Sequence, residues 1–537
     1  MQTQNILRQN YTLFSRPYQL KLPLEIGHVI PDNDCVRLLG QFVEELDLKD
    51  LYSTYSRVKE NQVSPRQMLK IMLYAYHEHN YSSRGIEKAC KRDINYMYLL
   101  EGRSAPDHAT IARFRSIHFG QVADKYLAMM VNYLMDLGEI SGKEIFIDGT
   151  KIEANANKYT FVWKKAVTKN QAKLLDKTAL LVQECVETYG LREIWHGQVK
   201  EKHLGKILKK LYEVKEEEGI EFVHGSGCRK TQLQKHIELL EEYTARLKEY
   251  SRKLKVLGDR NSYSKTDPDA TIMRMKEDAM LNGQLKPAYN LQLGVDSGYI
   301  SWLTLSPRPT DTSTLIPFLT SMEASLRHRY PVVVADAGYE SEENYSFLED
   351  HQITAMIKPA NYEISKTRKY KTDISRRENM PFKPDGDIYT CMNGSRLYAC
   401  SIYHKKSASG GYDRKVTVYR CYECQGCPHK SECIKGTNWK TPEEERFKKL
   451  NVSRKFERQR KECLERITSE EGIRLRVNRS IQAEGAFALW KEDGAFRQFL
   501  CRGQANVYAE CVLMAIAQNI DNLHRRIQNG KLGTHLY

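Results

Sequence analysis

The stretch "EIFIDGTKIEANANKYTFVWKK", residues 144–165, places an acidic residue directly after a run of strand-forming residues. The apolar triplet Ile-Phe-Ile favours a buried β-strand, and Asp148 follows it at once. Because Asp-Gly is a common turn dipeptide, one interpretation is that Asp148 and Gly149 form a turn that ends the strand. The other interpretation is that Asp148 is a metal ligand held on a rigid element, which requires partner residues elsewhere in the chain.

The size and charge of the chain limit the classes of protein to consider. A length of 537 residues is too great for one ordinary core and predicts two or more domains. Lys and Arg number 83 against 68 acids, so the net charge is 83 − 68 = +15, which favours an anionic polymer or surface as partner. No run approaches the roughly 18 apolar residues of a membrane span, and the first residues lack an apolar export signal. We therefore expect a cytoplasmic protein that handles nucleic acid, with no membrane partner.

Residues 64–135 have the pattern of short helices joined by polar turns. Ser64 is the expected N-cap of the first helix, Ser82 or Ser83 that of the next, and Asp107 that of a third. Basic helices of this kind resemble a helix-turn-helix DNA-binding unit. An ordinary helical domain with a solvated basic face is the alternative.

A long helical region is expected over residues 165–258. Its second half carries leucines seven residues apart, at Leu233, Leu240, Leu247 and Leu254, which is the spacing of one packed seam. The other seam position is weakened by Thr244 and Ser251, so we expect an intramolecular helical hairpin.

From about residue 286 the pattern becomes that of an α/β sheet. "PAYNLQLGVDSGYISWLTLSP" predicts two strands joined at Asp296-Ser297-Gly298. After it come a helix in "DTSTLIPFLTSMEASLRH", a buried strand in "YPVVVADAGYE", a helix in "SEENYSFLED" and a strand in "ITAMIKP". Apolar strands that alternate with helices indicate a sheet covered on both faces.

Two further acids are candidate partners of Asp148. Asp336 follows the strand "PVVVA" directly, as Asp148 follows its own strand, and ligands bind at such strand ends. Glu484 lies on a late helix among small residues that would let a phosphate backbone approach. Three carboxylates on separate elements can hold two Mg²⁺ ions roughly 3.5–4 Å apart. This favours the metal-ligand interpretation of Asp148.

Five blocks of the sequence resemble bacterial insertion-sequence transposases of the DDE type. They are "DGTKIEANANKYTFVWKK", "SKTDPDA", "PTDTSTLIPFL", "DAGYESEENYSFLE" and "RSIQAEGAFALWKEDGAFRQFLCRG". The resemblance implies an α/β fold in which a ribonuclease-H-like mixed sheet core is interrupted by a helical insertion and a cysteine-bearing insertion, after an all-α DNA-binding domain. It implies that Asp148, Asp336 and Glu484 form the catalytic triad and bind Mg²⁺ or Mn²⁺. The implied partners are the DNA of the element ends and target, and a second copy of the chain in the DNA complex.

This resemblance implies a division of the chain into six parts. They are a helical amino-terminal DNA-binding domain (1–135), the first part of the core (143–164), a helical insertion (165–280), the second part of the core (286–360), an insertion with a four-cysteine site (361–470), and the helix of the glutamate with the carboxy-terminal helices (471–528).

Related transposases often carry the signature Tyr-x2-Arg-x3-Glu-x6-Lys around the glutamate. Glu484 and Lys491 match it, but Ser480 occupies the Arg position and Val477 the Tyr position. Arg479 lies one residue away and can take the Arg role only if the helix starts at a different residue. Lys491 is a candidate phosphate contact, and a solvated surface lysine is the alternative.

The segment "CYECQGCPHKSEC" predicts a second metal site. Cys421, Cys424, Cys427 and Cys433 have spacings typical of a structural Zn²⁺ site, with His429 as an alternative ligand. An iron–sulfur cluster is the competing interpretation, because ferredoxins also repeat C-x2-C.

The leading functional hypothesis is a transposase that binds element ends and catalyses metal-dependent strand cleavage and transfer. The candidate DNA contacts are Lys491, Arg479, Arg84, Arg113 and Arg115. One alternative is a nuclease of the same fold that does not join strands. The other is a non-catalytic DNA-binding relic of a transposase.

Overall fold

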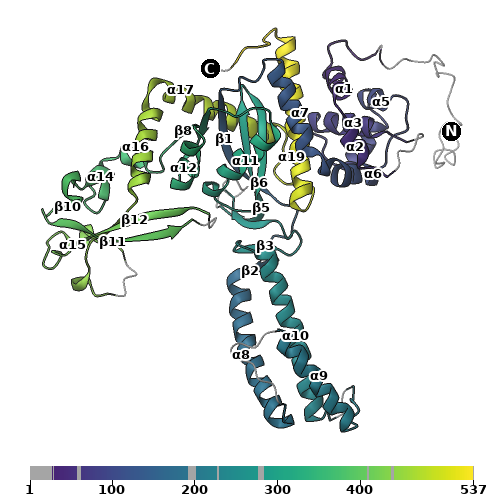
Figure 1. Cartoon of the computed structure of the whole chain (residues 1–537). Coiled ribbons are helices and arrows are strands. Elements are labelled where there is room, and N and C mark those ends of the chain that lie inside the picture. Colours follow the sequence, from purple (N-terminus) through teal and green to yellow (C-terminus); the bar gives the residue numbers. More distant parts are fainter. Residues whose placement is uncertain are drawn as a thin grey trace, which may run out of the picture. The chain divides into compact units, whose positions relative to one another are not determined.

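The computed structural model describes residues 27, 29–56, 62–191, 201–225, 229–275, 283–407, 411–436 and 441–535 (Figure 1). The amino-terminal segment that we expected to lack an export signal lies outside these residues. The chain divides into two compact units, Met1–Val122 with Ile516–Leu532, and Ala123–Ala515 with Gly533–Tyr537. Among the described residues, no helix is both long and apolar enough to cross a membrane.

The first unit is helical, as predicted. Ser64 caps the helix that begins at Pro65, and its hydroxyl and the Gln67 side chain form a reciprocal capping box. Ser82 and Asp107 cap the next two predicted helices, so all three expected caps are confirmed. The helices are α1 (Cys35–Glu45), α2 (Lys49–Ser53), α3 (Pro65–His77), α4 (Ser83–Cys90), α5 (Ile94–Leu100), α6 (His108–Arg113), the π-helix η4 (Phe114–His118), the 3-10 helix η5 (Phe119–Gln121) and the second half of α19 (Gln504–Gln528).

The second unit is built on a six-stranded mixed sheet. Its strand order is β4-β5-β1-β7-β8, with β6 paired to β5. β1 runs antiparallel to β5 and parallel to β7, and β7 runs parallel to β8. The strands are β1 (Glu144–Glu153), β4 (Thr271–Arg274), β5 (Leu285–Asp296), β6 (Tyr299–Ser306), β7 (Val332–Ala335) and β8 (Thr354–Ile357). The two strands predicted around Asp296-Ser297-Gly298 are confirmed, and Ser297 and Gly298 both have positive φ in the turn.

Helices cover this sheet closely enough that β5 is buried over its last ten residues. A Cβ at Gly294 of β5 would lie 2.6 Å from both Ile145 on β1 and Phe318 on α11. The sheet is therefore packed without room for another carbon at its centre. The helices of this unit are α7 (Ala123–Asp136), α11 (Leu315–Ser325) after the 3-10 helix η6 (Asp311–Ser313), α12 (Glu342–Asp350) after the 3-10 helix η7 (Ala337–Tyr339), α16 (Arg454–Thr468), α17 (Glu470–Arg479), the π-helix η11 (Ser480–Glu484), α18 (Gly485–Ala488), the π-helix η12 (Leu489–Asp493) and the first half of α19.

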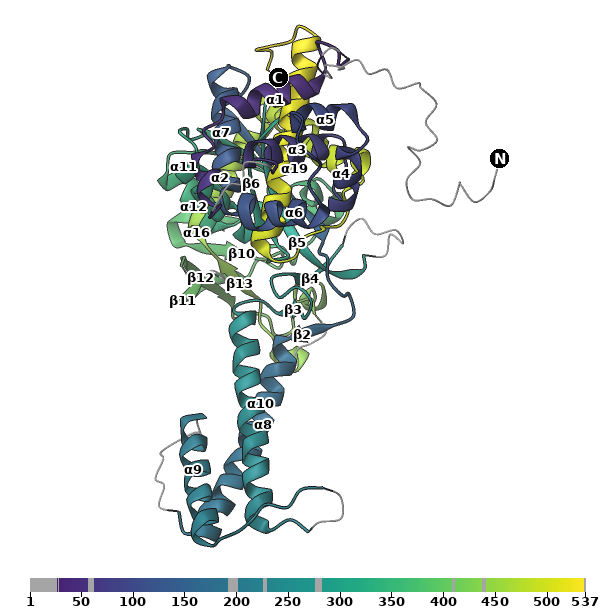
Figure 2. The same cartoon turned by 90° about the vertical axis from the view of Figure 1, so that its right-hand side faces the viewer.

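Between β1 and β5 the chain forms three long helices, α8 (Lys164–Tyr189), α9 (Glu201–Glu217) and α10 (Gln232–Leu257). Helices α8 and α10 run side by side, and α9 packs against both (Figure 2). The predicted leucine seam is buried in their shared core at Leu233, Leu240 and Leu247, which confirms the intramolecular hairpin. The short strands β2 (Phe161–Trp163) and β3 (Ser262–Ser264) pair where the chain enters and leaves this segment.

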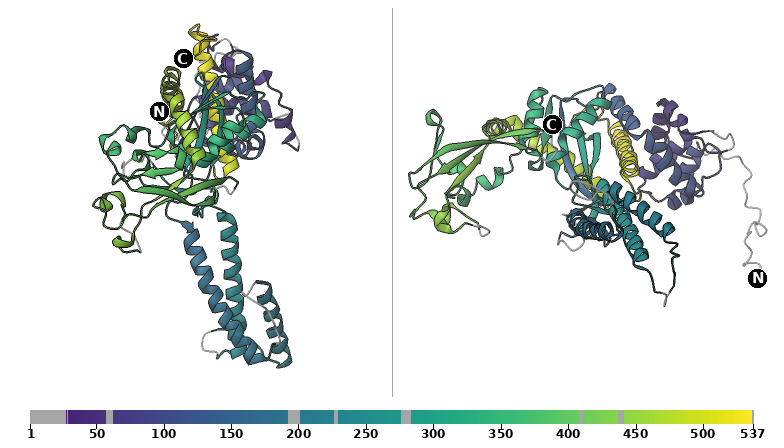
Figure 3. Two further views of the ribbon diagram at one scale, coloured as in Figure 1. Left: turned by 60° about the vertical axis from the view of Figure 1, so that its left-hand side comes forward. Right: turned by 60° about the horizontal axis from the view of Figure 1, so that its bottom comes forward.

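Between β8 and α16 the chain forms a second, antiparallel sheet that the sequence did not predict. Its order is β13-β12-β11-β10-β9, and β11 and β12 form the long hairpin drawn in green in Figure 3. The elements are α13 (Tyr362–Ser365), α14 (Arg368–Lys371), η8 (Arg377–Asn379), β9 (Phe382–Lys383), η9 (Pro384–Gly386), β10 (Ile388–Thr390), β11 (Arg396–Lys406), β12 (Asp413–Cys421), α15 (Lys430–Cys433), η10 (Glu443–Glu445) and β13 (Lys449–Val452).

Candidate active site

Asp148 of β1 and Asp336, which directly follows β7, lie at the same height along two neighbouring strands. β1 and β7 pair in parallel with Ile147 opposite Ala335, so the next residue on each side is an aspartate. β1 continues past Asp148 to Glu153 and pairs with β5 throughout. The prediction of a strand that stops at Asp148 is therefore wrong, and the turn interpretation of Asp148 and Gly149 falls with it, because this pair lies inside a ladder.

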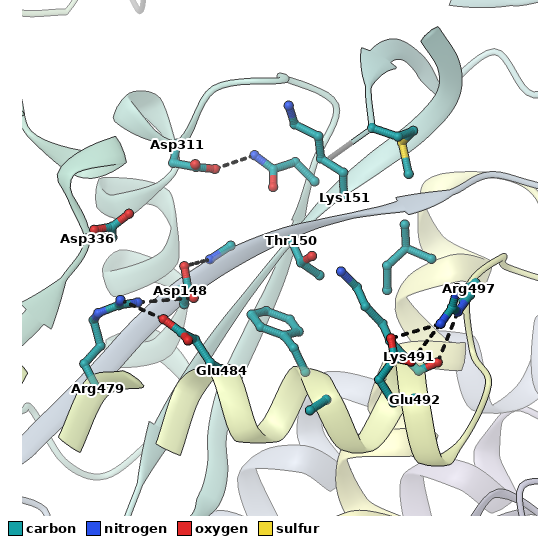
Figure 4. A pocket seen from close by; sticks show the side chains of 16 residues that line it. Asp148, Thr150, Lys151, Asp311, Asp336, Arg479, Glu484, Lys491, Glu492 and Arg497 are labelled. Atoms are coloured by element: carbon teal, nitrogen blue, oxygen red, sulfur yellow. Dashed lines mark hydrogen bonds and ion pairs between the residues drawn. The ribbon is translucent and has the colours of Figure 1, made fainter. Parts of the chain in front are cut away.

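Glu484 is brought to the same place by the helical segment that follows α17. It is the last residue of the π-helix η11, which contacts β1 and β5. The three acids line one cavity of about 450 Å³ (Figure 4). In Figure 4, Asp148 and Asp336 reach the cavity from the sheet, while Glu484 and Lys491 reach it from the helical segment.

Arg479 lies between two of the acids. Its Nη1 is 3.2 Å from Asp148 Oδ2, and its Nη2 donates to Glu484 Oε1 at 3.0 Å. The side chain is only 15% exposed. The guanidinium thus already holds one positive charge between two carboxylates of the predicted triad.

The π-helix explains why Arg479 reaches Glu484 although the two residues are five apart. A π-turn pairs residues i and i+5, whereas an α-turn pairs i and i+4. The wider turn therefore compensates for the single extra residue between Arg479 and Glu484, relative to the family signature. Positions 476 and 477 are Arg and Val, so this helix has no counterpart of the signature's tyrosine.

The pKa of Asp148 is raised above its ordinary value. Burial is the main cause, and the negative charges of Asp336 and Glu484 act in the same direction. The Arg479 charge and the Gly149 N–H, which donates to Asp148 Oδ1 at 2.8 Å, oppose this increase. The carboxylates therefore repel each other inside the protein, and the pocket favours a cation.

Other charged side chains complete the wall of the cavity. Lys491 and Lys151 both line it, and Arg497 lines it while paired with Glu492 at 2.8 Å. Two further acids line the cavity, Asp311 of η6 and the Glu492 that pairs with Arg497. The sequence interpretation missed Asp311, although the block "PTDTSTLIPFL" that contains it carried part of the family resemblance.

The arginines predicted to contact DNA in the first unit differ in exposure. Arg84 on α4 and Arg113 on α6 are exposed, and α4 and α6 pack against each other. Arg115 is only 5% exposed, and its guanidinium donates to Tyr76 Oη, the Tyr81 carbonyl and Ser83 Oγ. These bonds give Arg115 a role in holding the unit together, and its buried guanidinium is not exposed for a contact with DNA.

Of the four predicted zinc ligands, Cys421 ends β12, Cys433 ends the short helix α15, and Cys424 and Cys427 lie in the segment between them. Cys421 and Cys424 are buried in its core, with Cys433 and a fifth cysteine, Cys391, packed against them. The Lys448 N–H donates to Cys424 Sγ at 3.4 Å, and burial raises the pKa of the Cys421 thiol to about 12. Within the described residues, no group of three or more His, Cys, Asp or Glu side chains is arranged to hold a metal ion. This applies to the cysteines and to the acid triad alike.

The donor set of the cavity nevertheless fits a hard divalent cation. Carboxylate oxygens are the ligands that Mg²⁺ prefers, and Mg²⁺ is commonly bound by one or two of them with substrate phosphates. The Arg479 guanidinium pairs with both Asp148 and Glu484, so a positive charge is accommodated beside them.

Two family models match the chain. The model of a transposase DDE domain matches residues 390–524, a range that includes Glu484 and Lys491. The model of a second transposase domain matches residues 24–116, which covers most of the first helical unit. No curated protein and no solved structure matches the chain. The family matches confirm the resemblance to insertion-sequence DDE transposases.

The position of Arg479 predicts a competition with metal. We expect Arg479→Gln to bind Mn²⁺ several-fold more tightly than the wild type in the absence of DNA, because the competing guanidinium is removed from between two carboxylates. Titration followed by Mn²⁺ electron paramagnetic resonance measures this affinity.

Arg497→Gln is the matched control, since Arg497 lines the same cavity but pairs with Glu492. Weaker Mn²⁺ binding by Arg479→Gln would show that Arg479 orders the acids instead of competing for them.

Proposed function

Since the chain is similar to insertion-sequence DDE transposases at both its helical amino-terminal end and its carboxy-terminal part, we propose that it cleaves DNA at the ends of an element and transfers the strands to a target. The observation that carries this proposal is the meeting of Asp148, Asp336 and Glu484 around one cavity. Asp148 and Asp336 are 188 residues apart in the sequence (336 − 148), and Asp336 and Glu484 are 148 residues apart (484 − 336).

In this proposal the three carboxylates hold Mg²⁺ or Mn²⁺. When bound, such ions activate the attacking oxygen and stabilise the leaving oxygen of a phosphodiester. Lys491 and Lys151, which line the cavity, would hold the non-bridging oxygens of the DNA phosphate. Arg479 would release the carboxylates when the metal binds, and its guanidinium would then be available to a phosphate.

The strand arrangement supports a ribonuclease-H-like core. The central strand β1 has an antiparallel neighbour, β5, on one side and a parallel neighbour, β7, on the other. The first two acids lie on β1 and directly after β7, and the third lies on a helix that packs against β1. A mixed sheet of this kind is what the resemblance leads us to expect.

We expect Asp148→Asn, Asp336→Asn and Glu484→Gln each to reduce strand cleavage by at least about a thousandfold while DNA binding stays within a few-fold of wild type. Each substitution keeps the side-chain shape and removes the charge that binds the metal. Gel assays on DNA from the element's own flanks, with and without Mg²⁺, measure cleavage and strand transfer separately.

Glu492→Gln is a control on the same helical segment, because Glu492 is exposed and paired with Arg497. If any of the three variants cleaves DNA at the wild-type rate, the substituted residue is not part of the catalytic triad. Cleavage without strand transfer by the wild type would favour the nuclease alternative, and binding without cleavage would favour the relic.

We further propose that the first unit recognises the element ends, because catalytic carboxylates read no sequence. The exposed Arg84 and Arg113 lie on two helices that pack together, and they form no ion pair with any described acid. Both charges are therefore available to phosphates or to base edges.

We expect the full-length double variant Arg84→Ala/Arg113→Ala to bind element-end DNA at least about tenfold more weakly and with a smaller salt dependence. Fluorescence anisotropy at several salt concentrations and footprinting measure the two effects. Lys49→Ala is the control, because Lys49 is an exposed cation of the same unit. Unchanged protection of the terminal sequence by the double variant would place recognition elsewhere.

The cysteine segment is proposed to bind one structural Zn²⁺ per chain. The support is the gathering of Cys421, Cys424 and Cys433 in one packed cluster with an N–H donor to Cys424. We expect chelation or Cys424→Ser to lower the melting temperature, because structural zinc contributes directly to folding. Elemental analysis of the wild type and of Cys400→Ser, an exposed cysteine outside the cluster, should show zinc in both. Iron with inorganic sulfide, or no metal at all, would exclude the zinc site.

A further inference from the structure

Asp311 is a fourth acid of the candidate active site. It begins the 3-10 helix η6, in the segment that connects β6 to α11, and it lines the same cavity as the triad. Figure 4 shows Asp311 on the sheet side of the cavity, together with Asp336 and Asp148.

The carboxylate of Asp311 lies against the backbone of β1, which carries Asp148, and of η7, which follows Asp336. A Cβ at Gly149, next to Asp148, would lie 2.5 Å from Gln292 Nε2 and 3.0 Å from Asp311 Oδ1. A Cβ at Gly338, two residues after Asp336, would lie 3.1 Å from Asp311 Oδ2. The distances to the Asp311 oxygens are shorter than ordinary carbon–oxygen contacts, so glycine at these positions leaves room for Asp311 and, at Gly149, for Gln292 as well. The close contacts therefore explain why position 149 is a glycine although it lies inside a strand and not in a turn.

Buried amides fix Asp311 through one of its oxygens. Asn290 Nδ2 donates to Oδ1 at 2.7 Å, and Gln292 Nε2 donates to the same oxygen at 3.2 Å. Gln292 is fully buried and is itself oriented by Thr314 Oγ1 and by the Tyr339 hydroxyl, which both donate to its Oε1. Oδ2 accepts no hydrogen bond from the described residues. A carboxylate held by one oxygen, with the other free, is the arrangement of an oriented metal ligand.

Among the triad and Asp311, two acids have no ion pair within the described part of the chain. Arg479 pairs with Asp148 and Glu484. In the described part of the chain, neither Asp336 nor Asp311 forms an ion pair with a lysine or arginine. Two carboxylates held close together without a cation repel each other, and a bound divalent ion would remove this repulsion.

We propose that Asp311 is a fourth carboxylate of the divalent-cation site, and that its Oδ2 and the Asp336 carboxylate bind the same ion. This rests on the proposed function, because it concerns the same cavity. Two protein carboxylates are a usual protein contribution to a Mg²⁺ site, where water and phosphate oxygens supply the other ligands.

Mn²⁺ titration of the full-length protein without DNA tests this inference. Asp311→Asn keeps an oxygen that can accept from Asn290 and Gln292 but removes the charge. We expect its dissociation constant for Mn²⁺ to rise about tenfold or more, with a melting temperature close to that of wild type. Asp336→Asn should show a comparable rise. Asp259→Asn, an exposed aspartate outside the cavity, should bind Mn²⁺ as the wild type does.

Backbone cleavage by Fe²⁺ and peroxide gives a second readout that a purely structural role would not change. We expect cuts near Gly149, Asp311 and Gly338 in the wild type, and loss of the cuts near Asp311 in Asp311→Asn. Wild-type Mn²⁺ affinity and cutting in Asp311→Asn would overturn the inference and leave the triad untouched. A wild type that binds no Mn²⁺ without DNA would also overturn it, whereas the proposed function is decided separately by DNA cleavage.

Discussion

The parallel pairing of β1 with β7 is the interaction on which the rest of the site depends. Four consecutive pairs, from Glu144 opposite Val332 to Ile147 opposite Ala335, set the register of the two strands. Most of these residues are buried, and a slip by one residue would turn each strand's apolar side chains to the wrong face. The core therefore fixes the level at which Asp148 and Asp336 meet, although 188 residues separate them (336 − 148).

Concentrating acids at this level creates an electrostatic cost that the local structure offsets in part. Burial and the neighbouring acids raise the pKa of Asp148, and Arg479 acts against them. Arg479 can reach both Asp148 and Glu484 because the helix widens to a π-turn between positions 479 and 484. The single positive charge of this guanidinium offsets only one of the four negative charges of Asp148, Asp336, Glu484 and Asp311. The remaining charge sits on the side of Asp336 and Asp311, where a divalent cation would be bound most favourably.

The sequence predicted those parts of the fold that depend on local patterns. The caps at Ser64, Ser82 and Asp107, the leucine seam of α10 and the apolar strands β5 to β8 all carry their signal within about twenty residues. The failures have non-local causes. β1 passes through Asp148 because β5 pairs with it there, and an Asp-Gly-Thr sequence alone cannot show this.

The same reason explains the missed elements. β11 is exposed at ten of its eleven positions, so it lacks the alternation that marks a half-buried strand. Asp311 looks like an ordinary helix-start residue in the sequence, and its place in the cavity depends on contacts with residues that are distant along the chain, such as Gly149 and Asn290. A π-turn also leaves no periodic pattern in five residues, so the role of Arg479 could not be settled from spacing.

The two insertions do not disturb the site because each has its own core and returns to its starting point. The helices α8, α9 and α10 bury a shared cluster, and β2 pairs with β3 where the chain enters and leaves. The second insertion has a separate core in its own sheet, and Arg454 at the start of α16 pairs with Asp387 of that insertion. The entropy cost of closing a loop grows only with the logarithm of its length, and a folded insertion with adjacent ends costs less still. The geometry of the acids is therefore decided by the β1–β7 register and the π-turn, and the length of either insertion does not enter it.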